Sequence, residues 1–108
     1  MLKNVEKIKA FLEDKKANNI KILEVTELTT ICDYMIIADG NNVNHLDTLV
    51  DAVYDGLAAE GLTPRITEGN KTSGWVLMDY GDIIVQLFTE EMRNFYDLER
   101  IWSDAKLL

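Results

Sequence analysis

Three carboxylates come closest to a catalytic arrangement in this sequence. Asp79 and Asp82 flank the pair Tyr80-Gly81, and Asp33 precedes an apolar run. Carboxylates at strand ends can hold divalent metal ions for nucleotidyl transfer. Such an enzyme also needs a site for the triphosphate, and the sequence supplies no glycine-rich phosphate loop or basic cluster. We therefore favour backbone-capping or partner-binding roles for these acids, and keep a metal-dependent nucleotidyltransferase as an alternative.

Cys32 and His45 are the only residues of their types. A single cysteine forms neither an internal disulfide nor a cysteine-based zinc site, and a single histidine is a poor basis for one. Nothing in the sequence places His45 against Cys32 as the base of a nucleophile. We expect Cys32 to be a partly buried apolar residue beside a strand and His45 a partly exposed helix residue. The serine-hydrolase elbow is also absent. No metal, no cofactor and no enzymatic activity are expected.

Aromatic residues gather in the last third of the chain and indicate a binding surface. Most should be buried, but Tyr80 is expected to point outward from a tight turn, and Trp75 to be partly exposed beside a polar loop. Exposed Trp and Tyr next to acids are typical anchors of protein interfaces. The predicted partner-binding residues, on and around the hairpin 75–88, are Glu68, Trp75, Asp79, Tyr80, Asp82 and Tyr96.

The charge balance favours a basic partner. The chain has 11 Lys and Arg against 19 Asp and Glu, a formal net charge of -8. Such a surface repels phosphate backbones, so direct sequence-specific binding of nucleic acid is a poor hypothesis, whereas a basic protein is complementary. With 108 residues, 47% of them hydrophobic, the chain is expected to form one domain over 1–108. It shows no membrane-spanning run or secretory signal, so we expect a cytoplasmic protein.

The periodicity of apolar residues predicts the first half of the fold. An apolar stripe predicts a helix over 2–16, and a second stripe predicts a helix over 43–60 that ends at Gly61. Gly56 inside that helix predicts a close packing contact. Strands are expected at 20–26 and at 34–38, where the continuous apolar run is typical of a central strand.

The second half of the sequence predicts strands followed by helical turns. An edge strand is expected at 64–67, then a polar loop at 68–74. Strands at 75–79 and 83–88 are close enough to form a tight hairpin. Thr89 should cap a helical segment with Met92, Phe95 and Tyr96, followed by a turn carrying Leu98, Ile101 and Trp102. This order predicts an α/β fold with a mixed sheet of about five strands and helices packed on its faces.

Four stretches of the sequence together resemble a known family. They are Lys16-Ala17 followed by Ile20; Cys-Asp-Tyr-Met-Ile-Ile-Ala-Asp-Gly at 32–40; Glu68-Gly69 with Trp-Val-Leu-Met-Asp-Tyr-Gly-Asp at 75–82; and Arg93 with Phe-Tyr-Asp-Leu-Glu-Arg-Ile-Trp at 95–102. In this order, over nearly the whole chain, the sequence resembles the RsfS/Iojap family of ribosomal silencing factors.

The resemblance implies a nucleotidyltransferase-like fold without a catalytic site. It further implies binding to the large ribosomal subunit through large-subunit ribosomal protein fourteen, steric blocking of association with the small subunit, and repression of translation under nutrient limitation. Some members form homodimers. A dimeric scaffold with another partner is a second alternative, because the apolar strands and the C-terminal aromatic residues could build a self-interface. Two positions depart from the family pattern, which often has His at Gln86 and Asp at Asn19. Gln86 lies in an apolar strand, where it could contact the partner.

Overall fold

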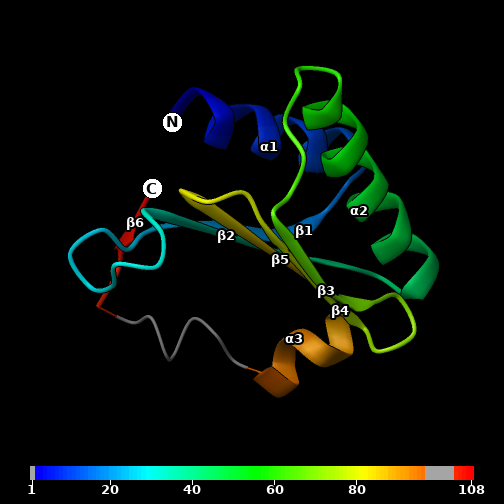
Figure 1. The fold of residues 1–108 in the computed structure, drawn as a ribbon. Helices are drawn as coiled ribbons and strands as arrows, with labels where there is room; N and C mark the ends of the chain where they lie inside the picture. Colours follow the sequence, from blue (N-terminus) through cyan, green and yellow to red (C-terminus); the bar gives the residue numbers. More distant parts are fainter. Residues whose placement is uncertain (1, 97–103) are drawn as a thin grey trace.

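A mixed sheet with helices on both faces forms the molecule, as the sequence predicts (Figure 1). The computed structural model describes residues 2–96 and 104–108, without the side chain of Tyr96. Its elements, in chain order, are α1 (Leu2–Asp14), β1 (Asn18–Glu24), β2 (Tyr34–Gly40), α2 (Val43–Ala58), β3 (Ile66–Asn70), β4 (Trp75–Asp79), β5 (Ile83–Thr89), α3 (Glu90–Tyr96) and β6 (Lys106–Leu107). The turn predicted around Leu98, Ile101 and Trp102 lies outside the described residues.

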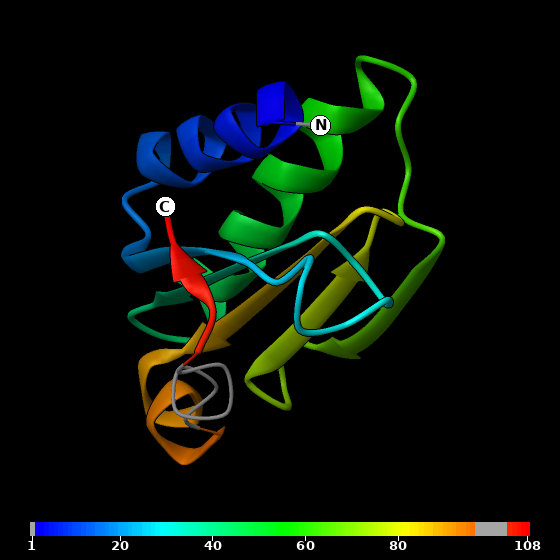
Figure 2. The ribbon, with the colours of Figure 1, turned by 90° about the vertical axis from the view of Figure 1, so that its left-hand side faces the viewer.

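The sheet has six strands in the order β3-β4-β5-β2-β1-β6, one more than expected. The pair β2 and β5 is parallel, and the other neighbours are antiparallel. β2 is central, as its apolar run predicts, and six of its seven residues are buried. The additional strand, β6, pairs only Lys106 and Leu107 with the end of β1 (Figure 2). Such a short strand carries no periodic signal, so the sequence does not reveal it.

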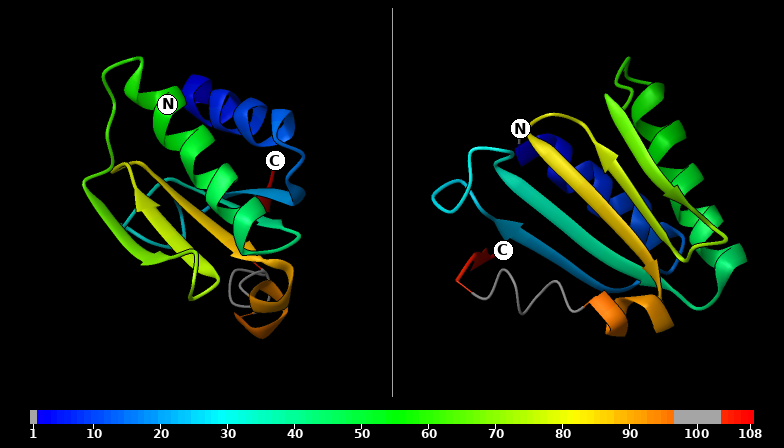
Figure 3. Two further views of the ribbon diagram at one scale, coloured as in Figure 1. Left: turned by 90° about the vertical axis from the view of Figure 1, so that its right-hand side faces the viewer. Right: turned by 60° about the horizontal axis from the view of Figure 1, so that its bottom comes forward.

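Two apolar clusters fill the two sides of the sheet. The upper core lies between the sheet and the helices α1 and α2; it includes Ile8, Leu49 and Val85. The lower core, on the opposite face, is smaller and is built around Ile37, Ile84 and Phe88. Figure 3 shows α1 and α2 behind the sheet and α3 at one end of the lower face. The two faces therefore differ: two long helices cover one, and of the described helices only the short α3 lies on the other.

Helix ends follow the predicted capping. The side chain of Asn42 accepts a hydrogen bond of 2.9 Å from the backbone N–H of His45 at the start of α2. The hydroxyl of Thr89 accepts one of 3.3 Å from the N–H of Met92 in α3. Gly61, with φ of 82°, takes the left-handed conformation that closes the end of α2.

The edge strand starts later than expected. It spans Ile66–Asn70, so Glu68, expected in a polar loop, lies within a strand paired with β4. The connecting turn is short and is held by Ser73, whose N–H donates to Oδ1 of Asn70 at 2.9 Å. Polar composition alone predicts a loop here, but pairing with β4 supplies the backbone hydrogen bonds that make the segment a strand.

Replacing Gly56 with alanine is expected to destabilise the fold, although alanine favours helix. A Cβ at this position would lie 2.5 Å from the ring of Phe11 in α1, so the ring would have to move or the two helices would have to separate. We expect a net loss of about 1–2 kcal/mol, because the overpacking strain exceeds the gain in helix propensity. Chemical denaturation measures this loss. Combining Gly56→Ala with Phe11→Leu should recover much of it, whereas a more stable single variant would contradict the close packing.

Candidate partner-binding surface

The pleat of the sheet divides the predicted partner-binding residues between two faces. Directly paired residues on neighbouring strands point to the same face. Glu68 pairs with Leu77, Trp75 with Asn70, and Asp79 with Ile66. Trp75 and Leu77 pack on the lower core, so this whole set points away from α1 and α2. We call the set the β3–β4 surface; it consists of Ile66, Glu68, Asn70, Trp75, Leu77 and Asp79.

This surface is accessible and has an apolar centre. All five residues of β3 are exposed, and Ile66 retains 51% of its accessible area. Trp75 and Leu77 on β4 are partly buried, so each leaves part of an apolar side chain at the surface. β3 is also the edge of the sheet, and an edge strand presents backbone N–H and C=O groups without a sheet partner. An accessible apolar centre beside an unpaired strand edge is suited to binding a protein.

Asp79 is fixed by the hairpin that follows it. Its Oδ1 accepts a hydrogen bond of 2.7 Å from the N–H of Gly81, and its Oδ2 lies 3.5 Å from Nη2 of Arg65. The interpretation of Asp79 as a carboxylate that satisfies a backbone donor in the turn is therefore confirmed. Because a carboxylate has several acceptor positions, Asp79 remains able to accept a hydrogen bond from a partner.

Gln86 supports Trp75 from inside the sheet. The indole Nε1 of Trp75 donates to Oε1 of Gln86 at 3.1 Å, and Nε2 of Gln86 donates to Sδ of Met35 at 3.5 Å. Only 8% of Gln86 is exposed, so the interpretation of this residue as a partner contact is wrong. Its amide uses both ends within the protein, and in doing so it holds the Trp75 ring in a fixed orientation.

Tyr80 does not point outward, contrary to the expectation for a turn residue. It follows Asp79, and because successive side chains alternate, its ring packs against the upper core on the other face. Its hydroxyl is buried and has no hydrogen-bond partner among the described residues. Burial, with a smaller contribution from Tyr54, raises the pKa of Tyr80 to about 12, so the phenol is neutral. Asp82, in the same turn, is exposed as expected.

The last predicted contact, Tyr96, is the final residue of α3, and its side chain lies outside the described residues. The structure thus brings Glu68, Trp75 and Asp79 together on the β3–β4 surface. It places Tyr80 and Asp82 at the hairpin turn, where both line a pocket under α1. The involvement of each of these residues in binding stays a prediction.

A buried ion pair that sequence reasoning missed holds α3 to the sheet. Nη1 of Arg93 donates to Oδ2 of Asp39 at 3.0 Å and also bonds the carbonyl oxygen of Asn19. Asp39 is 1% exposed and Arg93 8% exposed. Asn19 adds a bond of 3.3 Å from its side-chain Nδ2 to the same carboxylate oxygen. The sequence does contain one indication of this pair: Asp39 follows directly on the fully apolar strand predicted at 34–38. A carboxylate in such a position implies a buried cationic partner elsewhere in the chain.

The residues weighed for nucleophilic and metal chemistry have structural roles. Nδ1 of His45 accepts a hydrogen bond of 2.9 Å from the N–H of Asn41, and Nε2 donates to the carbonyl of Lys15 at 2.8 Å. Within residues 2–96 and 104–108, no three His, Cys, Asp or Glu side chains are grouped as metal ligands. Asp33, Asp79 and Asp82, on which the nucleotidyltransferase alternative depends, do not form such a group. No helix in the described part of the chain is long and apolar enough to cross a membrane.

Cys32 is expected to react very slowly with alkylating reagents while the protein is folded. Only 5% of the residue is exposed, and burial, with the nearby charges of Asp33 and Asp79, raises the pKa of its thiol from 9.0 to about 11. At pH 8 the thiolate fraction should fall by a factor of about 100 relative to the unfolded chain. Mass spectrometry after iodoacetamide treatment, with and without denaturant, measures the ratio of rates. Similar rates in both conditions would contradict the burial of Cys32.

The same raised pKa makes stability depend on pH. The folded protein holds the thiol proton more tightly than the unfolded chain does. The contribution of Cys32 to stability is therefore fully present below pH 9 and is lost as pH rises from about 9 towards about 11.

Comparisons with known proteins all point to one family. A family model described as "Ribosomal silencing factor during starvation" matches residues 1–108. A ribosomal silencing factor from Zymomonas mobilis is 39% identical over 93 residues, covering 85% of this chain and 69% of the relative. The Bacillus subtilis factor is 32% identical over 98 residues, covering 91% and 83%. A crystal structure of a Chromobacterium violaceum protein superposes with a TM-score of 0.90 at 29% identity, covering 95% of this chain and 86% of that one.

Proposed function

The chain belongs to the family of ribosomal silencing factors, RsfS, and from this premise we propose that it binds the large ribosomal subunit through the β3–β4 surface. In this proposal its contact is large-subunit ribosomal protein fourteen. The bound factor keeps the small subunit from joining and so represses translation, especially when nutrients are limited. The process takes place in the cytoplasm, where bacterial ribosomes work.

The observation that carries this proposal is the combination of shape and charge on the β3–β4 surface. Exposed Ile66 and the partly exposed Trp75 and Leu77 form an apolar centre, with Glu68 and Asp79 beside it. Protein interfaces commonly combine an apolar, aromatic-rich core with a charged rim. The net charge of -8 favours encounter with a basic ribosomal protein and disfavours encounter with bare RNA.

The proposed mechanism is occupancy. The molecule measures 35 × 33 × 22 Å along its principal axes. When the β3–β4 surface rests on the large subunit, α1 and α2 stand on the outer side of the sheet, because they cover its other face. A body of this thickness holds apart two subunits whose contacts require separations of a few ångströms. No bond is made or broken, and no cofactor is needed.

Sucrose-gradient sedimentation of purified ribosomal subunits, with and without the protein, tests the proposed function. We expect the protein to travel with the large subunit and the peak of joined ribosomes to shrink. Protein that stays at the top of the gradient, with an unchanged peak of joined ribosomes, would overturn the proposal. If the protein travels with the large subunit but the subunits still join normally, the proposed binding is supported and the proposed steric block is wrong.

A homodimer would use the same kind of surface. An edge strand with an exposed apolar centre is suited to pairing with a second copy as well as with a ribosomal protein. If the two uses overlap, large subunits should convert dimer to monomer. Sedimentation velocity of labelled protein, with and without subunits, distinguishes this competition from dimerisation through another surface.

A further inference from the structure

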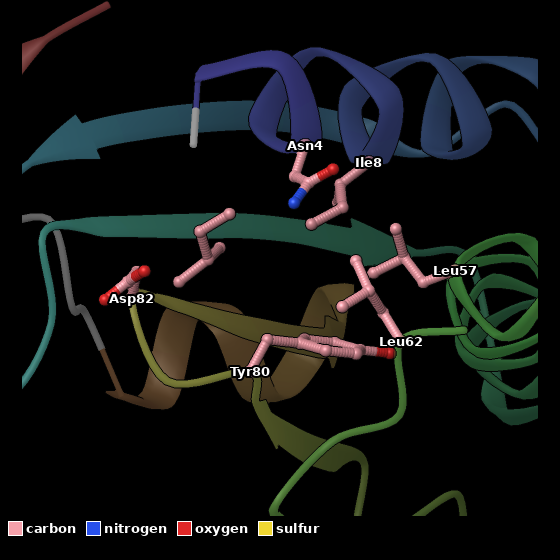
Figure 4. A pocket seen from close by; sticks show the side chains of 7 residues that line it. Asn4, Ile8, Leu57, Leu62, Tyr80 and Asp82 are labelled. Carbon is pink, nitrogen blue, oxygen red and sulfur yellow. The ribbon is translucent and has the colours of Figure 1, made fainter. Parts of the chain in front are cut away.

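A pocket of about 330 Å³ opens where three elements of the fold meet. Its lining residues come from α1, from the end of α2 and the segment after it, and from the turn between β4 and β5; they are Asn4, Ile8, Leu57, Leu62, Tyr80, Asp82 and Ile83. Figure 4 shows Asn4 and Ile8 reaching in from α1, with Tyr80 on the opposite side. The volume lies at the lower end of the range found for small-molecule sites.

The pocket has a mixed lining, in which aliphatic side chains stand beside the polar groups of Asn4, Tyr80 and Asp82. Ile8, Leu57 and Ile83 belong to the upper core, so their positions are fixed by packing on all other sides. Leu62, which also lines the pocket, is 39% exposed. A lining of well-packed aliphatic side chains together with a few polar groups suits a small amphipathic molecule.

One buried polar atom beside the pocket lacks a partner among the described residues. The ring of Tyr80 forms a wall, and its hydroxyl is buried with no hydrogen bond to any described residue. The hydroxyl is itself inaccessible, so a molecule in the pocket would pack against the ring of Tyr80. In Figure 4 this hydroxyl is directed towards the end of the pocket where Leu57 and Leu62 lie.

The charge at the other end of the pocket is negative. Asp82 lies away from Leu57 and Leu62, at the hairpin turn (Figure 4). The turn is held because the backbone carbonyl of Asp82 accepts hydrogen bonds from the N–H groups of Asp33 and Tyr34, at 2.8 and 3.1 Å. The carboxylate makes no ion pair within the described residues, and no Lys or Arg lines the pocket. An anionic ligand is therefore disfavoured and a cationic one favoured.

We propose that this pocket binds a small organic cation, a primary ammonium group carried on an apolar body. The ammonium group pairs with Asp82, and the apolar body lies between Ile8 and the ring of Tyr80 and extends towards Leu57. The proposal goes beyond ribosome binding, and the site is on the opposite face of the sheet from the β3–β4 surface.

Three probes of matched length test the proposal: hexylammonium, hexanol and hexanoate. Each is titrated into ¹⁵N-labelled protein and followed by the backbone NMR resonances of Ile8, Leu62 and Ile83. We expect saturable shifts with hexylammonium, binding about ten times weaker with hexanol because it lacks the charge-assisted hydrogen bond, and no binding of hexanoate. Equal binding of hexanol and hexylammonium, or saturable binding of hexanoate, would overturn the assignment of a cation site.

Two variants and one control locate the site. Asp82→Asn should reduce the affinity for hexylammonium to that for hexanol, whereas Asp51→Asn, an exposed carboxylate on α2 outside the pocket, should leave it unchanged. Leu62→Trp should block all three probes, and because Leu62 is partly exposed the larger side chain is compatible with the fold. No saturable shift with any probe at millimolar concentration, or unaltered binding in both pocket variants, would remove the proposed site. These measurements involve no ribosome, so they test the pocket independently of the proposed silencing function.

Discussion

Replacing Arg93 with methionine is expected to lower the free energy of unfolding by about 3–5 kcal/mol, because it leaves the carboxylate of Asp39 buried without its cation. Asp39 is 1% exposed, and its Oδ1 already lacks a hydrogen-bond partner among the described residues. The substitution also removes the hydrogen bond to the carbonyl of Asn19. For a domain of this size, the melting temperature should fall by an amount on the order of 20 °C.

Urea denaturation of the Arg93 variant measures this effect, and two further variants sharpen it. Lys7→Met breaks an ion pair with Glu60 that is partly exposed, and should cost less than about 1 kcal/mol. Combining Arg93→Met with Asp39→Leu removes both buried charges and should be more stable than Arg93→Met alone. If Arg93→Met unfolds at the same urea concentration as Lys7→Met, the buried pair does not stabilise the fold.

Replacing Trp75 with alanine is expected to weaken binding to the large ribosomal subunit by roughly 30-fold or more, because central aromatic anchors contribute about 2 kcal/mol or more at interfaces. The indole lies on the β3–β4 surface and is oriented by Gln86. Glu68→Arg, on the exposed edge strand, should act differently. It should slow association about ten-fold at low salt, with a smaller effect at high salt, because it reverses a rim charge.

Binding of fluorescently labelled protein to purified large subunits measures both effects. Tyr54→Ala is the control, because Tyr54 is an exposed aromatic residue on α2, on the opposite side of the sheet. Circular dichroism must show that the Trp75 variant keeps its fold, since the substitution also removes the hydrogen bond to Gln86. Loss of binding in the Tyr54 variant, with retention in the Trp75 variant, would place the ribosome on the helical face instead.

The arrangement of helices and strands could be predicted from local patterns, but the facing of individual residues could not. The apolar stripes fixed α1 and α2, and the uninterrupted apolar run identified β2 as central. Tyr80 was misplaced because a turn residue was assumed to point outward. Extending the alternation of β4 by one residue, past Asp79, would have placed its ring on the upper core.

Contacts between distant parts of the chain were beyond local patterns. Asp39 and Arg93 meet only because β2 and β5 are parallel neighbours and α3 follows β5 directly. One departure from the family pattern now has a physical reason. Asn19 adopts a left-handed backbone conformation, with φ of 51°, which Asn and Asp both tolerate better than other non-glycine residues.

Because Asp79 and Tyr80 are consecutive, one peptide unit carries a side chain of the β3–β4 surface on one side and a wall of the pocket on the other. A molecule in the pocket and a protein on the surface therefore act on the same short segment of backbone. If either changes the conformation of that segment, the two binding equilibria are linked. The factor by which the small molecule changes the affinity for the ribosome must then equal the factor by which the ribosome changes the affinity for the small molecule.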